Sequence, residues 1–186
     1  MLQELDPVDR ITAGAVGPPG QRVFYVQGRQ GTSLVTLVVE KQQLELLSSW
    51  VVDMLYRVGA ETGEGPPEEE MDLEEPLDPR WRAGRLSLGY EEDRDMMFLE
   101  VEELVESEAE SEAESEAESE EEEREEEPDL EVVRFWATRD QMMALARHGA
   151  AVCAAGRPRC EFCGGPIDPE GHVCPALDGH HEIGEA

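Results

Sequence analysis

The sequence predicts an α+β fold made of two similar halves, each with three strands and a helix, followed by a small metal-binding tail. Three observations lead to this prediction. Apolar, β-branched runs separated by glycine- and proline-containing turns occur in two sets along the chain. Each set is followed by a segment with apolar residues three and four positions apart, the period of a helix. Two short cysteine-containing motifs then follow near the C-terminus.

The first half is predicted over residues 8–59. Its strands are expected at 11–16, 22–27 and 34–39 because these runs are rich in β-branched and aromatic residues. A helix is expected next, with an apolar stripe that comprises Leu44, Leu47, Val51, Leu55 and Val58. Gly59 is placed to end this helix. We expect the stripe to pack on the sheet of the same half rather than to bind a partner.

The second half is predicted over residues 81–156. Its strands are expected at 85–90, 95–101 and 131–136. Thr138 followed by Gln141 has the form of a capping box, so a helix is expected from there to Gly156. On this helix, Cys153 is interpreted as a small core residue and His148 as an exposed polar residue.

Two segments interrupt the predicted single domain, which spans 8–156. Residues 60–80 are rich in glycine, proline and acidic residues and are predicted to be a linker, although Leu73 and Leu77 could touch the domain. Residues 106–127 repeat Glu-Ser-Glu-Ala, end in a glutamate run and carry close to half of the net charge. Like charges four residues apart disfavour a helix, so this acidic low-complexity insertion is predicted to be disordered.

The two halves, 8–59 and 81–156, are predicted to be an internal repeat. The proposed equivalences are Ala13-Gly14 with Ala83-Gly84, Phe24 with Phe98, Val38-Val39 with Phe135-Trp136, Gln43 with Gln141 and Leu47 with Leu145. We expect either two antiparallel three-stranded sheets or one joined sheet, with the helices on one face. The acidic insertion then falls in a hairpin loop of the second half.

The tail, residues 157–186, resembles a zinc knuckle. Cys160 and Cys163 are two residues apart and are followed by Gly164, a spacing that lets both sulfur atoms face one ion. His172 and Cys174 follow, and the flanking Gly171 and Pro175 favour the bend that a ligand pair one residue apart requires.

Three thiolates and an imidazole suit one structural, tetrahedral zinc ion. The predicted ligands are therefore Cys160, Cys163, His172 and Cys174. His180 or His181 could replace His172 as the fourth ligand.

Other roles for these cysteines stay open. Cys160 and Cys163 could form a redox dithiol, but no βαβ pattern surrounds them. The cysteines could also be unliganded thiols in a flexible tail. A structural disulfide is disfavoured because the N-terminus lacks the pattern of a signal peptide, so we expect a cytoplasmic protein.

The opening Ile11–Gly17 and Gly20–Tyr25, together with the closing Cys160-x-x-Cys163 and Gly171-His172-Val173-Cys174-Pro175, resemble an actinobacterial family of conserved proteins of unknown function. The likeness covers nearly the whole chain apart from the predicted linker and the acidic insertion. It implies a class of organism and a fold more than an activity. The chain departs from the family pattern after Pro175, where an arginine and then Asn-Gly-aromatic are usual.

Composition limits the function. The chain has 186 residues, with 15 basic against 45 acidic side chains and a net charge of −30, so it repels nucleic acid and anionic membrane surfaces. No apolar run is long enough to span a bilayer. No serine–histidine–aspartate set, phosphate-binding glycine loop or HExxH motif is present.

Two functions follow from these observations. The first is a non-enzymatic, zinc-stabilised protein that binds another protein or regulates it, with neither nucleic acid nor membrane as partner. The alternative is an enzyme with a small-molecule site between the two halves; no catalytic residue is assigned to it.

Overall fold

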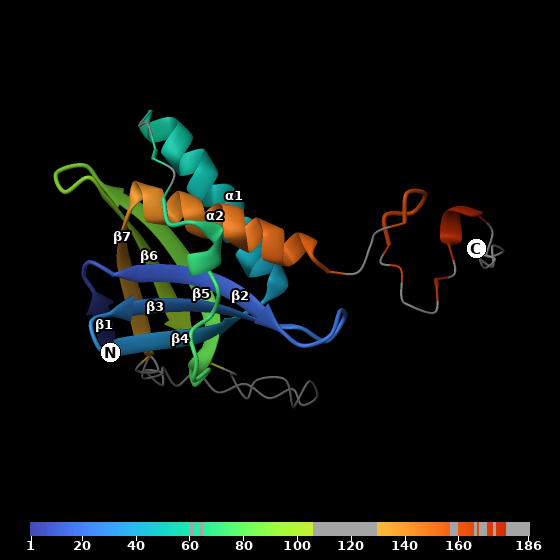
Figure 1. The fold of residues 1–186 in the computed structure, drawn as a ribbon, viewed down its shortest axis with the longest axis horizontal. Coiled ribbons are helices and arrows are strands. Elements are labelled where there is room, and N and C mark those ends of the chain that lie inside the picture. Colours follow the sequence, from blue (N-terminus) through green and yellow to red (C-terminus); the bar gives the residue numbers. More distant parts are fainter. Residues whose placement is uncertain are drawn as a thin grey trace, which may run out of the picture.

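The computed structural model describes residues 1–59, 62–63, 65–105, 130–156, 160–165, 167, 171–172 and 174–177. The fold is α+β, as predicted, with a seven-stranded mixed sheet. Figure 1 shows α1 and α2 together on one side of that sheet. Among the described residues, no helix has the length and apolarity needed to cross a membrane.

The elements follow in a simple order. The strands are β1 (Leu2–Leu5), β2 (Arg10–Val16), β3 (Val23–Gln30), β4 (Ser33–Val39), β5 (Pro79–Glu91), β6 (Met96–Glu103) and β7 (Val132–Thr138). The helices are α1 (Lys41–Val58) and α2 (Arg139–Ala154). The short 3-10 turns are η1 (Glu68–Glu70) and η2 (Pro175–Leu177).

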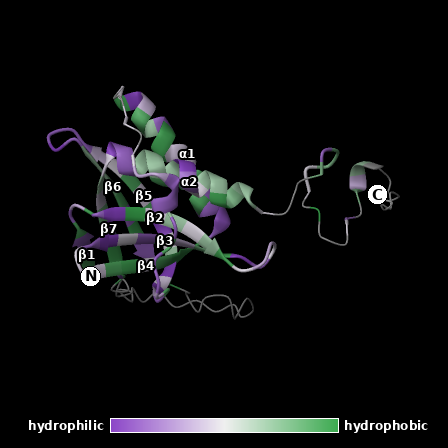
Figure 2. Ribbon diagram, viewed as in Figure 1, coloured by the Kyte–Doolittle hydropathy of each residue, from purple (hydrophilic) through white to green (hydrophobic). Residues whose placement is uncertain are grey.

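Both predicted helices are present, but α1 packs mainly on α2 and β5 rather than on the sheet of its own half, and α2 packs mainly on α1 and β2. In α2 the predicted capping box is present, because the Gln141 N–H donates to Thr138 Oγ1 at 3.2 Å and the Thr138 N–H donates to Gln141 Oε1 at 2.9 Å. In α1 the C-terminal Gly59 adopts the left-handed conformation with φ 67°. The α1 residues that are buried comprise Leu44, Leu47, Ser48, Val51 and Leu55. Figure 2 shows apolar residues along both helices.

The strands join into one sheet in the order β1-β7-β6-β5-β4-β3-β2. Of the two predicted arrangements, the joined sheet is the one observed. It is mixed rather than wholly antiparallel, since β4 runs parallel to β5 and β1 runs parallel to β7. The chain leaves β4, passes through α1 and returns before entering β5, which is the long crossover that parallel neighbours require.

β1 lies outside the predicted domain start at residue 8. The segment Leu2–Leu5 is too short to show a strand pattern, and its partner β7 lies about 130 positions along the chain, with Leu2 opposite Val132. The strand is nevertheless part of the core, because Leu5 is 1% exposed.

The sheet is curved so that its two ends approach each other. The Val8 N–H donates to the carbonyl of Trp136 in β7 at 2.8 Å, and the Asp9 N–H donates to that of Arg29 in β3 at 2.8 Å. Between these strands, a Cβ on Gly28 would lie 2.4 Å from the ring of Phe135. Glycine at position 28 therefore leaves the space that the buried phenylalanine ring fills.

Residues 65–78, which we call the strap, lie on the sheet and on α2. Gly65 approaches Asp140 and Ala144 of α2, and His148 Nδ1 lies 2.6 Å from Glu68 Oε1. Because Asp140, Ala144 and His148 are four residues apart, they form one stripe along the helix. The first part of the strap thus follows α2.

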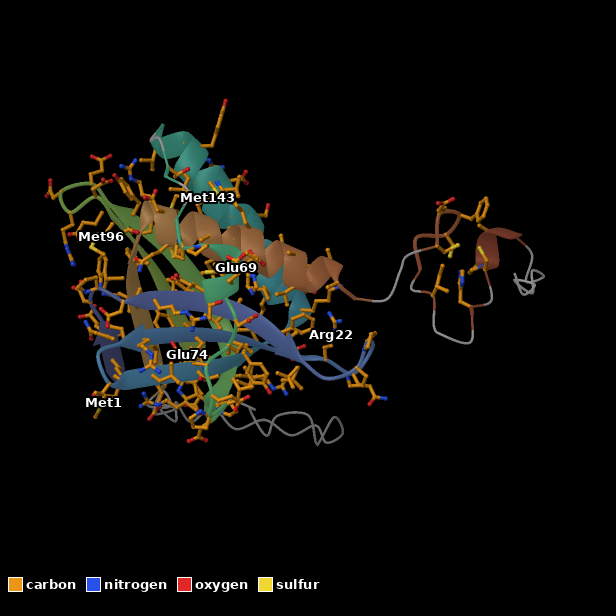
Figure 3. All side chains as sticks on the ribbon, in the orientation of Figure 1. Met1, Arg22, Glu69, Glu74, Met96 and Met143 are labelled. Carbon is orange, nitrogen blue, oxygen red and sulfur yellow. The ribbon has the colours of Figure 1, made fainter. Side chains whose placement is uncertain are left out.

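The strap then crosses β2, β3 and β4. The Thr12 hydroxyl donates to the carbonyl of Met71, whose side chain is 1% exposed. Gln27 bonds the backbone of Glu74 twice, accepting from its N–H at 2.8 Å and donating to its carbonyl at 3.1 Å. Figure 3 labels Glu74 where the strap crosses these strands.

Glu74 also forms ion pairs with two strand arginines. Arg10 Nη1 lies 2.9 Å from Glu74 Oε1, and Arg29 Nε lies 2.7 Å from Oε2. The hydrogen bond from Arg29 is the main reason that the pKa of Glu74 is lowered. The segment predicted as a linker, 60–80, therefore contains both the strap and the start of β5 at Pro79.

The predicted acidic insertion, 106–127, lies outside the described residues. Its place in the topology is the predicted one, because β6 and β7 are antiparallel neighbours and the insertion falls in the connection between them.

The predicted internal repeat stays a prediction, and an alignment of the two three-strand units on their helix caps would shift its strand equivalences. Val39 and Ala137 each precede an N-cap, and both are in the core. Their cross-strand partners are Phe24 and Met97, so this alignment would match Phe24 with Met97 and not with Phe98. A one-residue shift places a side chain on the opposite face of a sheet, and Phe24 and Met97 are buried whereas Phe98 is partly exposed.

Through the strand register, the same alignment would match Ala13-Gly14 with Leu88-Gly89 and not with Ala83-Gly84. Gln43 and Gln141 each lie three positions after an N-cap, and Leu47 and Leu145 each lie four positions after that glutamine.

Candidate metal centre

The cysteine turn at 160–165 is shaped by its own backbone. The Gly164 N–H donates to the Cys160 carbonyl at 2.8 Å, and the Cys160 N–H donates to the Gly165 carbonyl at 2.8 Å. Gly164 has φ 69°, a left-handed conformation that glycine adopts without strain. This turn brings Cys160 and Cys163 to one side, as their spacing predicts.

The second ligand pair is brought to the same place by a bend. Gly171 has φ 92°, again in the region that favours glycine. η2 begins at Pro175, directly after Cys174. Between these two features, His172 and Cys174 direct their donor atoms toward the cysteine turn although they are only two positions apart.

The four donor atoms lie within 4.8 Å of one another. Cys160 Sγ and Cys174 Sγ are 3.8 Å apart, and Cys163 Sγ and His172 Nε2 are 3.3 Å apart. Cys160 and Cys174 are 7% and 8% exposed, while Cys163 and His172 are partly exposed. In Figure 3 the sulfur atoms of this segment gather on its inner side. The arrangement could hold a metal ion.

The environment of Cys160 favours the thiolate that a metal requires. Backbone N–H groups of Cys163 and then Phe162 donate to its sulfur and lower the pKa of Cys160 to about 7. Burial has the opposite effect on Cys174, whose pKa is raised. A cation between the two sulfur atoms would favour the thiolate form of both.

All four predicted ligands thus meet in one cluster. His180 and His181, the alternatives for the fourth ligand, lie outside the described residues. Cys153 is elsewhere, buried on α2 with its Sγ 3.9 Å from the Lys41 carbonyl. Burial raises the pKa of Cys153 to about 11, which agrees with its prediction as a core residue.

Comparison with known proteins decides the family. The model of a family described as "Protein of unknown function (DUF3090)" matches residues 3–174, which is most of the chain. The chain belongs to the DUF3090 family. Neither the search of curated proteins nor that of solved structures found a match. The matched range ends at Cys174, the last of the clustered residues.

In this DUF3090 chain the prediction for His148 is wrong. The side chain is not an exposed polar group: the residue is 8% exposed and contacts Glu68 of the strap. Its position three residues after Leu145, on the core face of α2, was the available signal.

A second candidate site is a hollow where β4 and β5 begin to separate. It has a volume of about 280 Å³ and is lined by Gln3, Ser33, Leu34, Val35, Thr36, Asp78 and Arg80. Arg80 already has two partners, since its Nη1 donates to Gln3 and its Nε lies 2.8 Å from Glu131 Oε2. The hollow is smaller and more polar than most ligand sites.

Proposed function

We propose that this DUF3090 chain is a non-enzymatic interaction or regulatory protein whose C-terminal segment is held closed by one structural zinc ion. The spacing of the donor atoms carries the proposal. With zinc–sulfur bonds of about 2.3 Å, two sulfur ligands of a tetrahedral ion lie about 3.8 Å apart. Cys160 Sγ and Cys174 Sγ are separated by 3.8 Å. A sulfur and a nitrogen ligand would lie about 3.5 Å apart by the same geometry, and Cys163 Sγ lies 3.3 Å from His172 Nε2.

The composition of the cluster supports a structural rather than a catalytic ion. Four protein ligands fill a tetrahedral site and leave no position for water or substrate. Three of the four are cysteine, which favours zinc over magnesium, calcium or manganese. Such a site stabilises a short segment that has little core of its own.

An exposed aromatic residue supports a protein partner. Phe162, inside the cysteine turn, is 66% exposed. Large apolar side chains on a rigid turn are common anchors at protein interfaces. The net charge of −30 disfavours nucleic acid and anionic membranes as alternatives.

Metal analysis tests the zinc site. The reduced full-length chain is expected to contain one zinc ion, Cys163→Ser none and His172→Ala less than one. Cys153→Ser is the matched control, because it removes a thiol from α2 and leaves the cluster intact. Full zinc retention in Cys163→Ser would show that the ligands are assigned wrongly.

A pull-down with cross-linking tests the interaction role. We expect a stoichiometric protein partner that is lost in Phe162→Ser, with zinc retained, and that is kept in Tyr56→Ser. Equal recovery of the partner by Phe162→Ser and by the parent chain would show that the zinc segment does not form the interface.

The alternative function, an enzyme with a site between the halves, rests on the hollow at the β4–β5 junction, where the two units meet. A small molecule retained in a native mass spectrum and lost in Asp78→Ala would favour it. Arg80 is already paired within the protein, so a ligand in the hollow would depend on Asp78 for a charged contact.

We also propose that the two three-strand units arose by duplication. Each has two antiparallel pairings, β2–β3–β4 or β5–β6–β7, and each enters its helix directly from the third strand. Glutamine occupies the third helical position in both, as Gln43 and Gln141. Superposition of homologous experimental structures on the cap-based alignment tests this; a better fit in another register would contradict it.

A further inference from the structure

We propose that peroxide converts the metal-held segment into a disulfide-held one by joining Cys160 to Cys174 and expelling the ion. This inference rests on the proposed zinc site and adds a means of regulating it. The sulfur atoms of Cys160 and Cys174 are 3.8 Å apart, and both residues are more than nine-tenths buried. A disulfide needs a sulfur–sulfur distance of about 2.05 Å, so only a small approach of the two side chains is required.

The chemistry balances with one equivalent of hydrogen peroxide. The Cys160 sulfur attacks a peroxide oxygen, the O–O bond breaks, and the departing hydroxide takes a proton to form water. The resulting sulfenic acid is attacked by the Cys174 sulfur; the S–O bond breaks and a second water leaves. The two thiolates lose two electrons, the peroxide gains them, and zinc departs as the aqueous ion because two of its four ligands are lost.

Burial of this pair directs the second step. A water-sized oxidant can reach a sulfur that larger thiols cannot, and the sulfenic acid then has a protein thiol as its nearest partner. Cys163 differs from the pair because it is partly exposed and its sulfur lies 3.3 Å from a histidine nitrogen. We therefore expect Cys163 to remain a free thiol after oxidation.

The two states hold the segment together differently. Zinc ties the cysteine turn to the second ligand pair through four side chains, whereas the disulfide would do so through one bond closing the loop from residue 160 to residue 174. Cys163 and His172 are released in the oxidised state. Oxidation thus changes the surface next to the exposed Phe162 without opening the segment completely.

The test uses the zinc-loaded, full-length chain. One equivalent of hydrogen peroxide is added while a chromogenic chelator reports released zinc, and non-reducing peptide mapping locates the cross-link. We expect one zinc released per chain, two thiols lost, a Cys160–Cys174 link, and recovery of zinc binding after reduction. Cys153→Ser should behave like the parent chain.

The absence of a zinc site and the absence of the Cys160–Cys174 link give different experimental results. A reduced chain that holds no zinc defeats the zinc site, and the link can still be sought by oxidising that metal-free chain, with Cys174→Ser as the variant that cannot form it. Zinc that stays bound while peroxide is consumed would overturn the inference. So would release accompanied by a link through Cys163, or by sulfinic acid without a disulfide.

Discussion

Replacing Met71 with alanine tests whether the strap is part of the folded core. The Met71 side chain is 1% exposed, and its backbone carbonyl accepts a hydrogen bond from Thr12 that the substitution leaves in place. Truncating a buried methionine costs about 2–5 kcal/mol, and the lower half of that range applies where neighbours can move into the space. Met71 lies on a surface segment whose neighbouring side chains can move into the space, so we expect a loss of about 2–3 kcal/mol.

A chain of this length loses about 2–4 °C in melting temperature per kcal/mol, so Met71→Ala should melt about 4–12 °C below the parent. Thermal and urea unfolding followed by circular dichroism give the two measurements. Leu46→Ala is the control, because Leu46 lies on α1 and is 43% exposed; it should change stability by about 0.5 kcal/mol or less. If Met71→Ala melts with the control, the strap does not contribute its side chains to the core.

Three further outcomes are expected. Glu74→Gln should reduce the loss of stability that the parent chain shows at acid pH. The Arg29 hydrogen bond lowers the pKa of Glu74, so the ionised carboxylate contributes its full stabilisation above the pKa of the unfolded chain. That stabilisation is lost as the pH falls through the pKa of Glu74 in the folded chain. A parent-like acid limb in urea titrations would contradict this. Gly28→Ala should cost about 1–3 kcal/mol in urea unfolding, since its Cβ would meet the Phe135 ring at 2.4 Å; an unchanged midpoint would argue against the close approach. Lowering the pH toward 5, or adding a chelator, should remove zinc because the thiolates are protonated or outcompeted. Far-UV circular dichroism should then stay nearly constant, and global unfolding would place the C-terminal segment inside the core.

Local patterns predicted most strands and both helices. The apolar stripe of α1, its terminal Gly59 and the Thr138–Gln141 capping box each depend on residues within a few positions, so they are visible in the sequence. The four residues of the metal site could be predicted for the same reason. Ligand type and spacing identify a cysteine turn and a bent pair without knowledge of the rest of the fold.

Features that depend on distant partners were not predicted. The strap is acidic and proline-containing, which is typical of a linker, but its contacts come from Gln27, Arg29 and Thr12 on strands that precede it by more than forty positions. β1 is recognisable only through its pairing with β7. His148 was misjudged because its partner, Glu68, belongs to the strap.

The β6–β7 connection has a practical consequence for engineering. The Glu103 N–H donates to the Glu131 carbonyl at 2.9 Å, and the Leu104 N–H donates to that of Arg82 at 2.8 Å, so the sheet itself holds the two ends of the connection side by side. Closing a loop costs only about 0.6 kcal/mol more for each doubling of its length. Residues 107–127 could therefore be replaced by an affinity tag, or by a reporter domain whose two termini lie close together. We expect β6 and β7 to keep their register after such an insertion.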